Sequence, residues 1–253
     1  MSGDESISLN KRISASGYCS RREADKLIEQ GRVSVNGDVA LPGARVLPQD
    51  KIYIDDELLK LTPSKKDQTF IIALNKPEQI TCTTDPNDKT NVIRFLNHPK
   101  RIFPIGRLDK DSEGLLFLTN NGDIVNKILR AGNAHEKEYI VTVDKKITPE
   151  FISKMSKGVR ILGITTLPCK VWQVSGKTFH IILTQGLNRQ IRRMCEVFDY
   201  KVISLRRTRI MHIKLGSLAP GKWRYLSDAE MKEMMEQIAD SKNEAPPKAG
   251  PLK

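Results

Sequence analysis

The chain has 253 residues and a formal net charge of +12 at pH 7, with 42 lysines and arginines against 30 acidic residues. A hydrophobic content of 39% is ordinary for a globular protein, and no apolar run approaches the roughly 18 residues that a membrane span requires. The excess of positive charge favours a polyanionic partner, usually a nucleic acid or an acidic membrane surface.

The four cysteines and four histidines are scattered, and no C-x-x-C pair is present. This distribution argues against a metal site and predicts reduced thiols. The first ten residues include Asp4 and Glu5, where a secretory signal would have basic and then apolar residues. We therefore expect a cytoplasmic protein.

Residues 7–60 are predicted to form a small unit of helices and strands. Helices are expected over 8–17 and 20–31, the second beginning with Ser20 as N-cap and Glu23 as its capping-box partner. The alternating Val33 and Val35 lead into Asn36-Gly37, a strong hairpin-turn signal. Further strands are expected around 45–46 and over 51–55.

Basic side chains gather at the two predicted helices of this unit: Lys11, Arg12, Arg21 and Arg22. Helix N-termini present unpaired N–H groups, so such a cluster can bind phosphate groups. On spacing alone, a solvated helix face explains the same residues equally well.

Residues 61–68, LTPSKKDQ, are predicted to be a linker because they combine a proline, polar residues and no periodicity. Residues 69–239 then form the second domain, and residues 240–253 are predicted to be a disordered basic tail, being too polar and proline-rich to fold. The positive charge is concentrated beyond the first 63 residues, which have a net charge of −1.

Within the second domain, strands are expected over 69–77, 114–123, 137–144 and 177–186, and again at 201–205. Helices are expected after Asp123, over 187–200, and from Ser227 onward, where Met231, Met234, Met235 and Ile238 form an apolar stripe. This irregular succession of strands and helices predicts an α+β fold.

The stretch GRLDKDSEGLL, residues 106–116, contains three closely spaced carboxylates. Asp109, Asp111, Glu113 and Gly114 approximate positions one, three, five and six of a calcium loop. Position twelve, however, is Asn120 instead of a bidentate glutamate, and a turn stands where a helix should begin. The pattern therefore argues against calcium.

An exposed acidic turn is the simplest alternative, but apolar segments flank the stretch on both sides. A carboxylate at the edge of a core is partly desolvated and needs a cationic partner. Residues 189–209 offer six arginines and one lysine against two acidic residues. Arginine is the side chain that makes bidentate contacts with phosphate or carboxylate.

Four motifs occur in order: LNKP (74–77), GRLDKDSEGLLFLTN (106–120), KEY (137–139) and GLNRQIRRM (186–194). Together they resemble the pseudouridine synthases that modify ribosomal RNA. Residues 9–37 resemble the alpha-L RNA-binding domain. The combination is similar to the subfamily that includes the small-subunit synthase A and the large-subunit synthases B, E and F. The resemblance implies an alpha-L domain followed by a mixed, mainly antiparallel sheet with flanking helices.

The implied reaction breaks the N1–C1′ bond of a uridine in RNA, turns the base and joins C5 to C1′, without a cofactor. The resemblance implies that Asp109 is the catalytic carboxylate, that Arg192 pairs with it, and that Tyr139 lies against the base. Whether Asp109 adds to C6, attacks C1′ or removes the 2′ proton stays open. Asp111 and Glu113 are expected to cap the loop.

The resemblance also implies RNA contacts. Arg107 is expected to help open the RNA, whereas Lys76 is either a phosphate contact or a structural residue before the proline. The other basic residues expected to bind RNA are Arg189, Arg193, Arg206 and Arg207. One departure is Gln79, where the family usually has glycine: its Cβ resists a positive φ, which predicts an altered turn.

We therefore expect an enzyme that flips out and isomerises a uridine of large-subunit ribosomal RNA, with a transfer RNA uridine as a second candidate substrate. A monomer without membrane association is favoured. The alternative is a non-catalytic RNA-binding factor for ribosome assembly on the same fold. The retained Asp109, Tyr139 and Arg192 argue against that alternative.

Overall fold

The structure is a computed structural model that describes residues 6–60, 69–129, 134–239 and 241. It divides into two compact units, residues 1–68 and 69–253. The predicted linker over 61–68 lies outside the described residues, as does the predicted tail over 240–253 except for residue 241. Among the helices that the structure describes, none has the length and apolar character needed to cross a bilayer.

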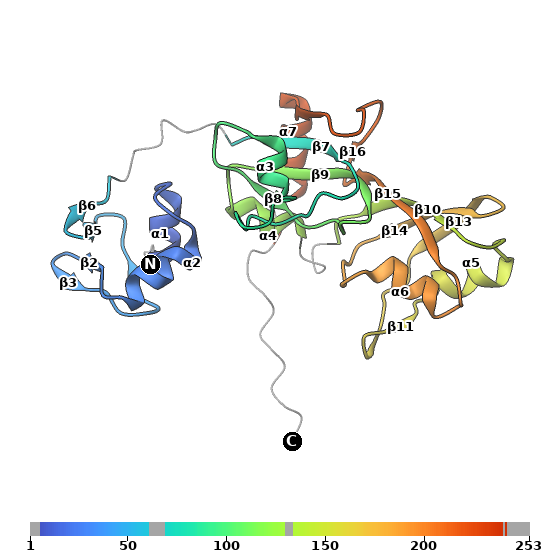
Figure 1. The fold of residues 1–253 in the computed structure, drawn as a ribbon, viewed down its shortest axis with the longest axis horizontal. Coiled ribbons are helices and arrows are strands. Elements are labelled where there is room, and N and C mark those ends of the chain that lie inside the picture. Colours follow the sequence, from blue (N-terminus) through green and yellow to red (C-terminus); the bar gives the residue numbers. More distant parts are fainter. Residues whose placement is uncertain (1–5, 61–68, 130–133, 240, 242–253) are drawn as a thin grey trace, which may run out of the picture. The chain divides into compact units, whose positions relative to one another are not determined.

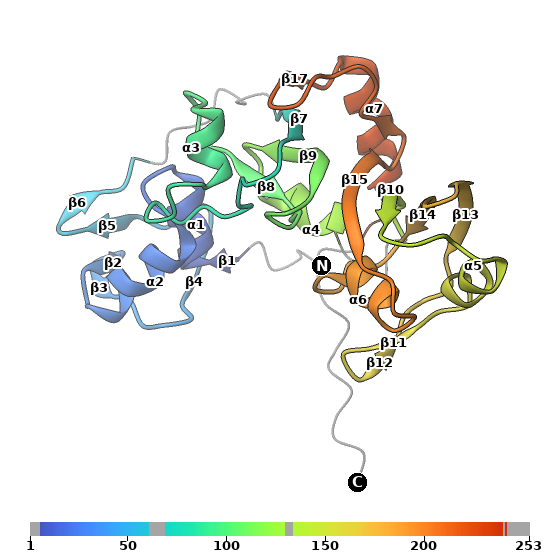
Figure 2. The same cartoon turned by 45° about the vertical axis from the view of Figure 1, so that its right-hand side comes forward.

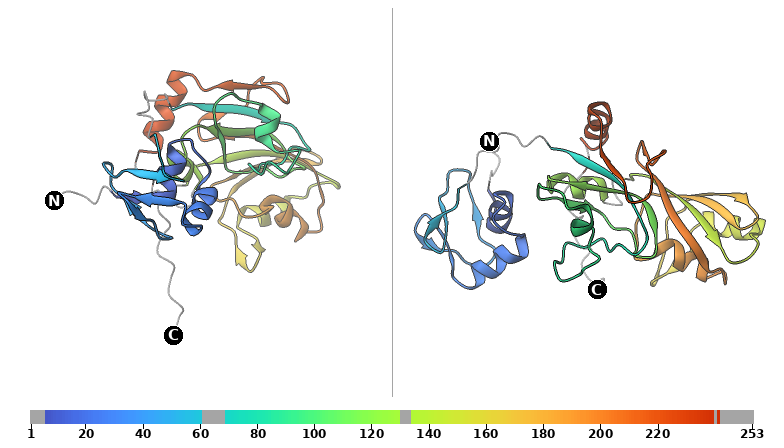
Figure 3. Two further views of the ribbon diagram at one scale, coloured as in Figure 1. Left: turned by 60° about the vertical axis from the view of Figure 1, so that its left-hand side comes forward. Right: turned by 45° about the horizontal axis from the view of Figure 1, so that its top comes forward.

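The first unit packs two short helices beside a small sheet (Figures 1 and 3). Strands β2, β3, β5 and β6 form a four-stranded antiparallel sheet in the order β3-β2-β5-β6, and β1 pairs with β4. The predicted capping box at Ser20 and Glu23 is confirmed by hydrogen bonds in both directions. The elements are β1 (Ile7–Ser8), α1 (Leu9–Ala15), α2 (Arg21–Glu29), β2 (Val33–Val35), β3 (Asp38–Val39), β4 (Arg45–Val46), β5 (Ile52–Ile54) and β6 (Glu57–Leu58).

The second unit alternates strands with short helices. Its first half contains β7 (Ile71–Lys76), α3 (Val92–Leu96), β8 (Phe103–Ile105), β9 (Glu113–Thr119), α4 (Asp123–Leu129), β10 (Lys137–Val143), α5 (Pro149–Ser156), β11 (Arg160–Ile161) and β12 (Ile164–Thr165). Its second half contains β13 (Lys170–Ser175), β14 (Thr178–Leu183), α6 (Gln190–Glu196), β15 (Val202–Ile210), β16 (Ile213–Lys214), β17 (Trp223–Tyr225) and α7 (Asp228–Gln237).

In the described part of this unit, nine strands form one sheet with the main order β13-β14-β10-β15-β9-β7-β17, while β8 and β16 pair with β9 and β15. Neighbouring strands are antiparallel except for β15 and β9, which are parallel. The sheet is therefore mixed and mainly antiparallel, and the predicted fold class is confirmed. The hairpin β11–β12 lies outside this sheet, beside α6 (Figure 2).

The central strands are buried on both faces. In β7, Ile72 and Leu74 join one core, whereas Ile71 and Ala73 join a second core on the other face. This is the alternation that a strand covered on both sides requires. The first core contains Tyr139 of β10, so this face of the sheet also holds a residue of the predicted site.

Helix α7 covers the second core, where Met234 and Ile238 are fully buried. The predicted methionine stripe is wrong at Met235, which is 44% exposed. The helix begins at a capping box formed by Ser227 and Glu230, as predicted. Arg224 of β17 also donates two hydrogen bonds of 2.7 Å to the Glu230 carboxylate.

Replacing Glu230 by glutamine is expected to lower the free energy of unfolding by about 1 to 2 kcal/mol at neutral pH, because the charged hydrogen bonds with Arg224 are lost, while glutamine can still accept at the helix cap. The Arg224 hydrogen bond lowers the pKa of Glu230 to about 2. A depressed pKa stabilises the fold above the unfolded value near 4.3. The difference between variant and wild type should therefore shrink as the pH falls from about 4.5 to 2, measured by denaturant titration. A difference independent of pH would contradict this ion pair.

Candidate active site

The acidic stretch forms a loop between β8 and β9, tied down mainly through its backbone. Gly106 leads into the loop with φ +81°. The Leu108 amide donates to Sγ of Cys82 at 3.3 Å. The amide of Gln79 donates to the carbonyl of Lys110 at 2.7 Å. These contacts place the loop without using its carboxylates, which stay available for other partners.

Two arginines at the start of α6 reach the carboxylates of this loop: Arg189, its N-cap residue, and Arg192. Arg189 binds Asp111 through two hydrogen bonds of 3.2 Å and lies 3.7 Å from Asp109. Arg192 lies 3.4 Å from the Asp111 carboxylate and donates to the Asp111 carbonyl at 2.6 Å. Loop and helix, far apart in sequence, are therefore joined by one cluster of charges.

The expected partner of Asp109 is corrected by this geometry. Within the described part of the chain, Asp109 forms its ion pair with Arg189, and Arg192 forms its ion pair with Asp111. Burial raises the pKa of Asp111, but the Arg189 hydrogen bonds and the charge of Arg192 outweigh it and leave the pKa lowered. Asp111 therefore does more than cap the loop, because it binds both arginines.

Arg192 is buried, whereas Arg189 is exposed. Besides Asp111, Arg192 donates to Oγ of Ser112 at 3.1 Å and to the carbonyl of Val202 at 3.3 Å. Its guanidinium therefore links α6, the acidic loop and the start of β15.

Replacing Arg192 by glutamine is expected to lower the free energy of unfolding by about 3 kcal/mol, because buried acceptors lose their donor. The matched variant Arg189→Gln removes an ion pair in solvent and should cost less than about 1 kcal/mol. Denaturant unfolding of both variants measures the difference. Equal losses would contradict the structural role assigned to Arg192.

Tyr139 lies in β10 opposite Arg207 of β15, and the Arg207 guanidinium carbon is 5.9 Å from the centre of the tyrosine ring. Arg207 is 4% exposed and donates to the carbonyl of Leu115 at 2.6 Å. It also approaches the carbonyl of Arg107 at 3.5 Å. Arg207 therefore connects the tyrosine to the acidic loop.

Lys76 is fully buried at the end of β7. Its Nζ donates to the carbonyls of Pro77 and Ile80, at 2.8 and 2.9 Å. Burial lowers the pKa of the lysine. Of the two roles expected for Lys76, the structural one fits this geometry, and the phosphate contact does not.

Comparison with known proteins identifies this arrangement. The family model for RNA pseudouridylate synthases matches residues 70–197, and the model for the S4 domain matches residues 8–52. The chain is 55% identical over 246 residues to the dual-specificity RNA pseudouridine synthase RluF of Escherichia coli (strain K12), covering 97% of this chain and 84% of that protein. It belongs to the RNA pseudouridine synthase family.

Two further relatives agree. Ribosomal large subunit pseudouridine synthase B of Bacillus subtilis (strain 168) is 35% identical over 245 residues, which are 93% of this chain and 98% of that protein. A crystal structure of a pseudouridylate synthase superposes with a TM-score of 0.66 and 27% identity, covering 90% of this chain and 99% of the other. The synthase therefore isomerises uridine in RNA to pseudouridine, and the resemblance found in the motifs is confirmed.

The turn after β7 of the synthase differs from the expectation for Gln79. Despite its Cβ, this residue has φ +68°, the left-handed conformation that glycine adopts readily. Because the side chain is exposed, its Cβ meets no packed neighbours. The positive φ therefore costs only backbone strain, about 1 kcal/mol. In return, its amide reaches the carbonyl of Lys110 in the acidic loop.

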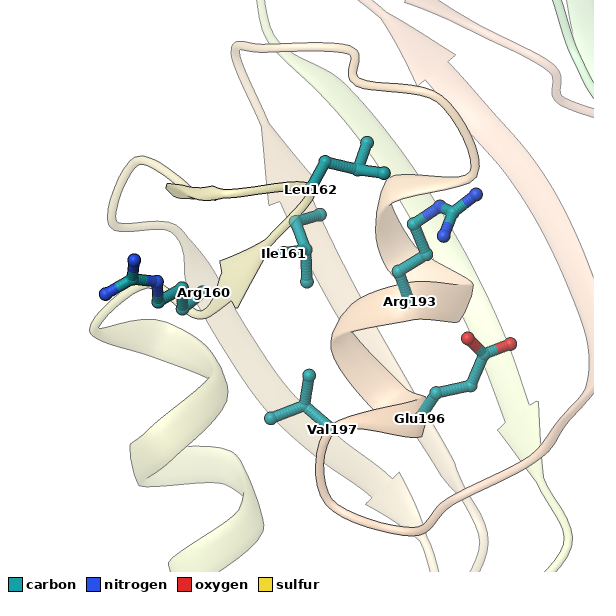
Figure 4. Close-up of a pocket in the computed structure, with 6 residues that line it drawn as sticks. All are labelled: Arg160, Ile161, Leu162, Arg193, Glu196 and Val197. Atoms are coloured by element: carbon teal, nitrogen blue, oxygen red, sulfur yellow. The ribbon is translucent and has the colours of Figure 1, made fainter.

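The other basic residues of the synthase lie in different settings. Arg107 is exposed at the entry to the acidic loop. Arg206 is half-buried, and its Nε is 3.8 Å from Glu113. Arg193 binds Asn188 through the carbonyl and the side-chain oxygen. Beside it, a hollow of about 320 Å³ separates α6 from the hairpin β11–β12 (Figure 4), lined by Arg160, Ile161, Leu162, Arg193, Glu196 and Val197.

In the S4 domain, Arg21 and Arg22 are exposed at the start of α2. Lys11 and Arg12 are half-buried, and Arg12 donates to the carbonyl of Pro48 at 2.9 Å. The first pair is therefore available to a partner, while Arg12 also has a structural contact.

Sequence reasoning missed two residues of the synthase site. Cys82 anchors the loop through Leu108, and no local pattern marks that contact. Gly114 has φ +108°, and a Cβ there would lie 2.3 Å from the carbonyl oxygen of Arg207. A glycine inside an apolar strand is a signal of close backbone approach, and it could have been used. Among the described residues, no group of three His, Cys, Asp or Glu side chains is placed to hold a metal ion.

Proposed function

We propose that this synthase modifies a uridine of large-subunit ribosomal RNA. The supporting observation is its 35% identity, over 98% of that protein, to a synthase whose name states the ribosomal large subunit. The 55% identical relative is described as having dual specificity, which supports a second RNA substrate, and a transfer RNA is the second candidate. The basic charge of the chain suits either polyanion.

For the catalytic roles, we propose Asp109 as the carboxylate that reacts with the nucleotide. Its side chain is 34% exposed, at the edge of a core, and Arg189 keeps a positive charge 3.7 Å away. Addition to C6, attack on C1′ and removal of the 2′ proton all use a carboxylate oxygen that can reach the nucleotide.

Tyr139 and Arg107 complete the proposal. Tyr139 is held in the sheet by pairing on both sides and by Arg207, and it is proposed to stack on the flipped base. Arg107, exposed two residues before Asp109, is proposed to occupy the space that the base leaves. Arg192 is proposed to position the loop through Asp111. We further propose that the enzyme acts as a monomer in the cytoplasm.

The substrate proposal is tested by mapping pseudouridine in ribosomal and transfer RNA from cells that lack the gene. The expected result is the loss of at least one large-subunit site, restored by the wild-type gene and not by the Asp109→Asn variant. Loss of transfer RNA sites alone would overturn the ribosomal assignment. An unchanged map in both RNAs would overturn both substrate assignments and favour a role in ribosome assembly.

A further inference from the structure

Aromatic rings gather at the β17 edge of the catalytic sheet, away from the residues assigned to catalysis. Three of them are substantially exposed: Trp223 by 39%, Tyr225 by 49% and Phe95 by 40%. Exposed large aromatic side chains in such a cluster commonly mark a binding surface. We call this set the aromatic patch: Phe70, Phe95, His98, Trp223 and Tyr225.

Four rings of the aromatic patch hold one another in place: Phe70, His98, Trp223 and Tyr225. Nε2 of His98 is 2.8 Å from the Tyr225 hydroxyl. The centre of the Tyr225 ring is 5.4 Å from that of Trp223 and 5.3 Å from that of Phe70, both with edge-to-face geometry. Rings ordered in advance lose little conformational entropy when a partner binds.

The charge around the aromatic patch suits a polyanion. Residues 94–101 and 221–225, which carry most of it, contain five basic residues and no acidic one. Nζ of Lys100 lies 5.7 Å from the centre of the Phe70 ring. Arg224, between Trp223 and Tyr225 in sequence, points to the other face of the sheet, where Glu230 pairs with its charge. Aromatic faces combined with positive charge are the means by which proteins bind unpaired nucleotides.

The aromatic patch also lies on the face of the sheet that holds Tyr139. Trp223 pairs with Leu74 and Tyr225 with Ile72, and directly opposed residues of paired strands share a face. Leu74, Ile72 and Tyr139 belong to the same core. Four strand spacings separate β10 from β17, or roughly 19 Å. That distance corresponds to about six stacked nucleotides.

We propose that the aromatic patch binds the RNA substrate by stacking unpaired nucleotides that flank the target uridine. Ile72 and Leu74 are fully buried on this face, so RNA held at Tyr139 would reach the β17 edge over the residues that cover them. The inference rests on RNA being the substrate and not on which RNA is modified. A pseudouridine map without large-subunit sites would therefore leave it standing.

The two tryptophans of the chain, Trp172 and Trp223, allow a direct test. Trp172 is 40% exposed, like Trp223, but lies in β13 at the opposite edge of the sheet. It pairs with His180, which pairs with Ile140, so it occupies the face opposite to Tyr139. The full-length Trp172→Phe variant leaves Trp223 as the reporter, and Trp223→Phe leaves Trp172 as the control.

The probes are two RNA fragments around the mapped uridine, with about ten and about three flanking nucleotides on each side, chosen to exceed or fall short of the roughly 19 Å span. Stacking on a nucleobase quenches tryptophan fluorescence. The long fragment is expected to quench Trp223 and the short one is not, while Trp172 responds to neither. Changing Trp223 to alanine should lower the ratio of the affinities for long and short fragments about tenfold.

Two results would overturn the proposal. One is an unquenched Trp223 when fluorescence anisotropy of the labelled long fragment shows that it is bound. The other is a dimer in sedimentation experiments that the Trp223→Ala variant abolishes, because the patch would then be covered by a second copy of the chain.

Discussion

Replacing Gly114 by alanine is expected to lower the free energy of unfolding by more than about 3 kcal/mol. The added Cβ would lie 2.3 Å from the carbonyl oxygen of Arg207 and 2.6 Å from its amide nitrogen. Both are backbone atoms of β15, so relief requires β15 to move away from β9. Strain at φ +108° adds to the clash, since a left-handed or more unusual backbone costs about 1 to 3 kcal/mol.

Gly163 supplies the matched control for this substitution. It has φ +79° at the turn of the β11–β12 hairpin, but a Cβ there would meet nothing within 4 Å. The Gly163→Ala variant should therefore show the strain alone, about 1 kcal/mol. Denaturant titration of both variants measures the difference. Similar losses would show that the close approach of β9 to β15 does not add to the cost of a Cβ at residue 114.

Replacing Asp109 by asparagine is expected to reduce turnover by at least about 10³-fold, because the amide retains the shape of the side chain but not its nucleophilic or basic oxygen. Single-turnover assays on the RNA identified by mapping measure this loss, and binding of the same RNA is expected to persist. The result would separate chemistry from substrate binding.

The Asp111→Asn variant is the matched control, since it lies in the same loop and loses the same charge. Asp111 binds Arg189 and Arg192, so its loss should reduce stability more than it reduces turnover. Equal losses of turnover in the two variants would mean that Asp109 acts through the charge cluster and not on the substrate.

Features set by neighbours in the sequence could be predicted. The capping boxes at Ser20 and Ser227 depend on a residue three positions away, and both are present. The strands with strong alternation, such as β10 and β14, were likewise anticipated. Short edge strands such as β17 were not, because they are defined by pairing and not by their own periodicity.

The arrangement of the site could be predicted only in part. Arg192 donates to Asp111 across 81 positions in the sequence. Which of Asp109 and Asp111 pairs with Arg192 depends on the backbone conformation of the loop, and the identities of the two residues do not predict that conformation. Likewise, the burial of Lys76 depends on two carbonyls, those of Pro77 and Ile80, that only the folded turn presents. The motifs therefore identified the residues of the site, whereas tertiary packing determined which of them pair with each other.

The parallel pairing of β9 with β15, called the seam below, has a consequence for the order of folding. Arg207 binds the carbonyl of Leu115 across 92 positions, whereas hairpins such as β13–β14 close short loops. Contacts that close long loops carry a larger entropic cost and tend to form late. The seam also joins Tyr139 to the acidic loop, so the site is expected to assemble among the last steps. While β15 is still inside the ribosomal exit tunnel, the nascent chain would therefore be inactive on any RNA nearby.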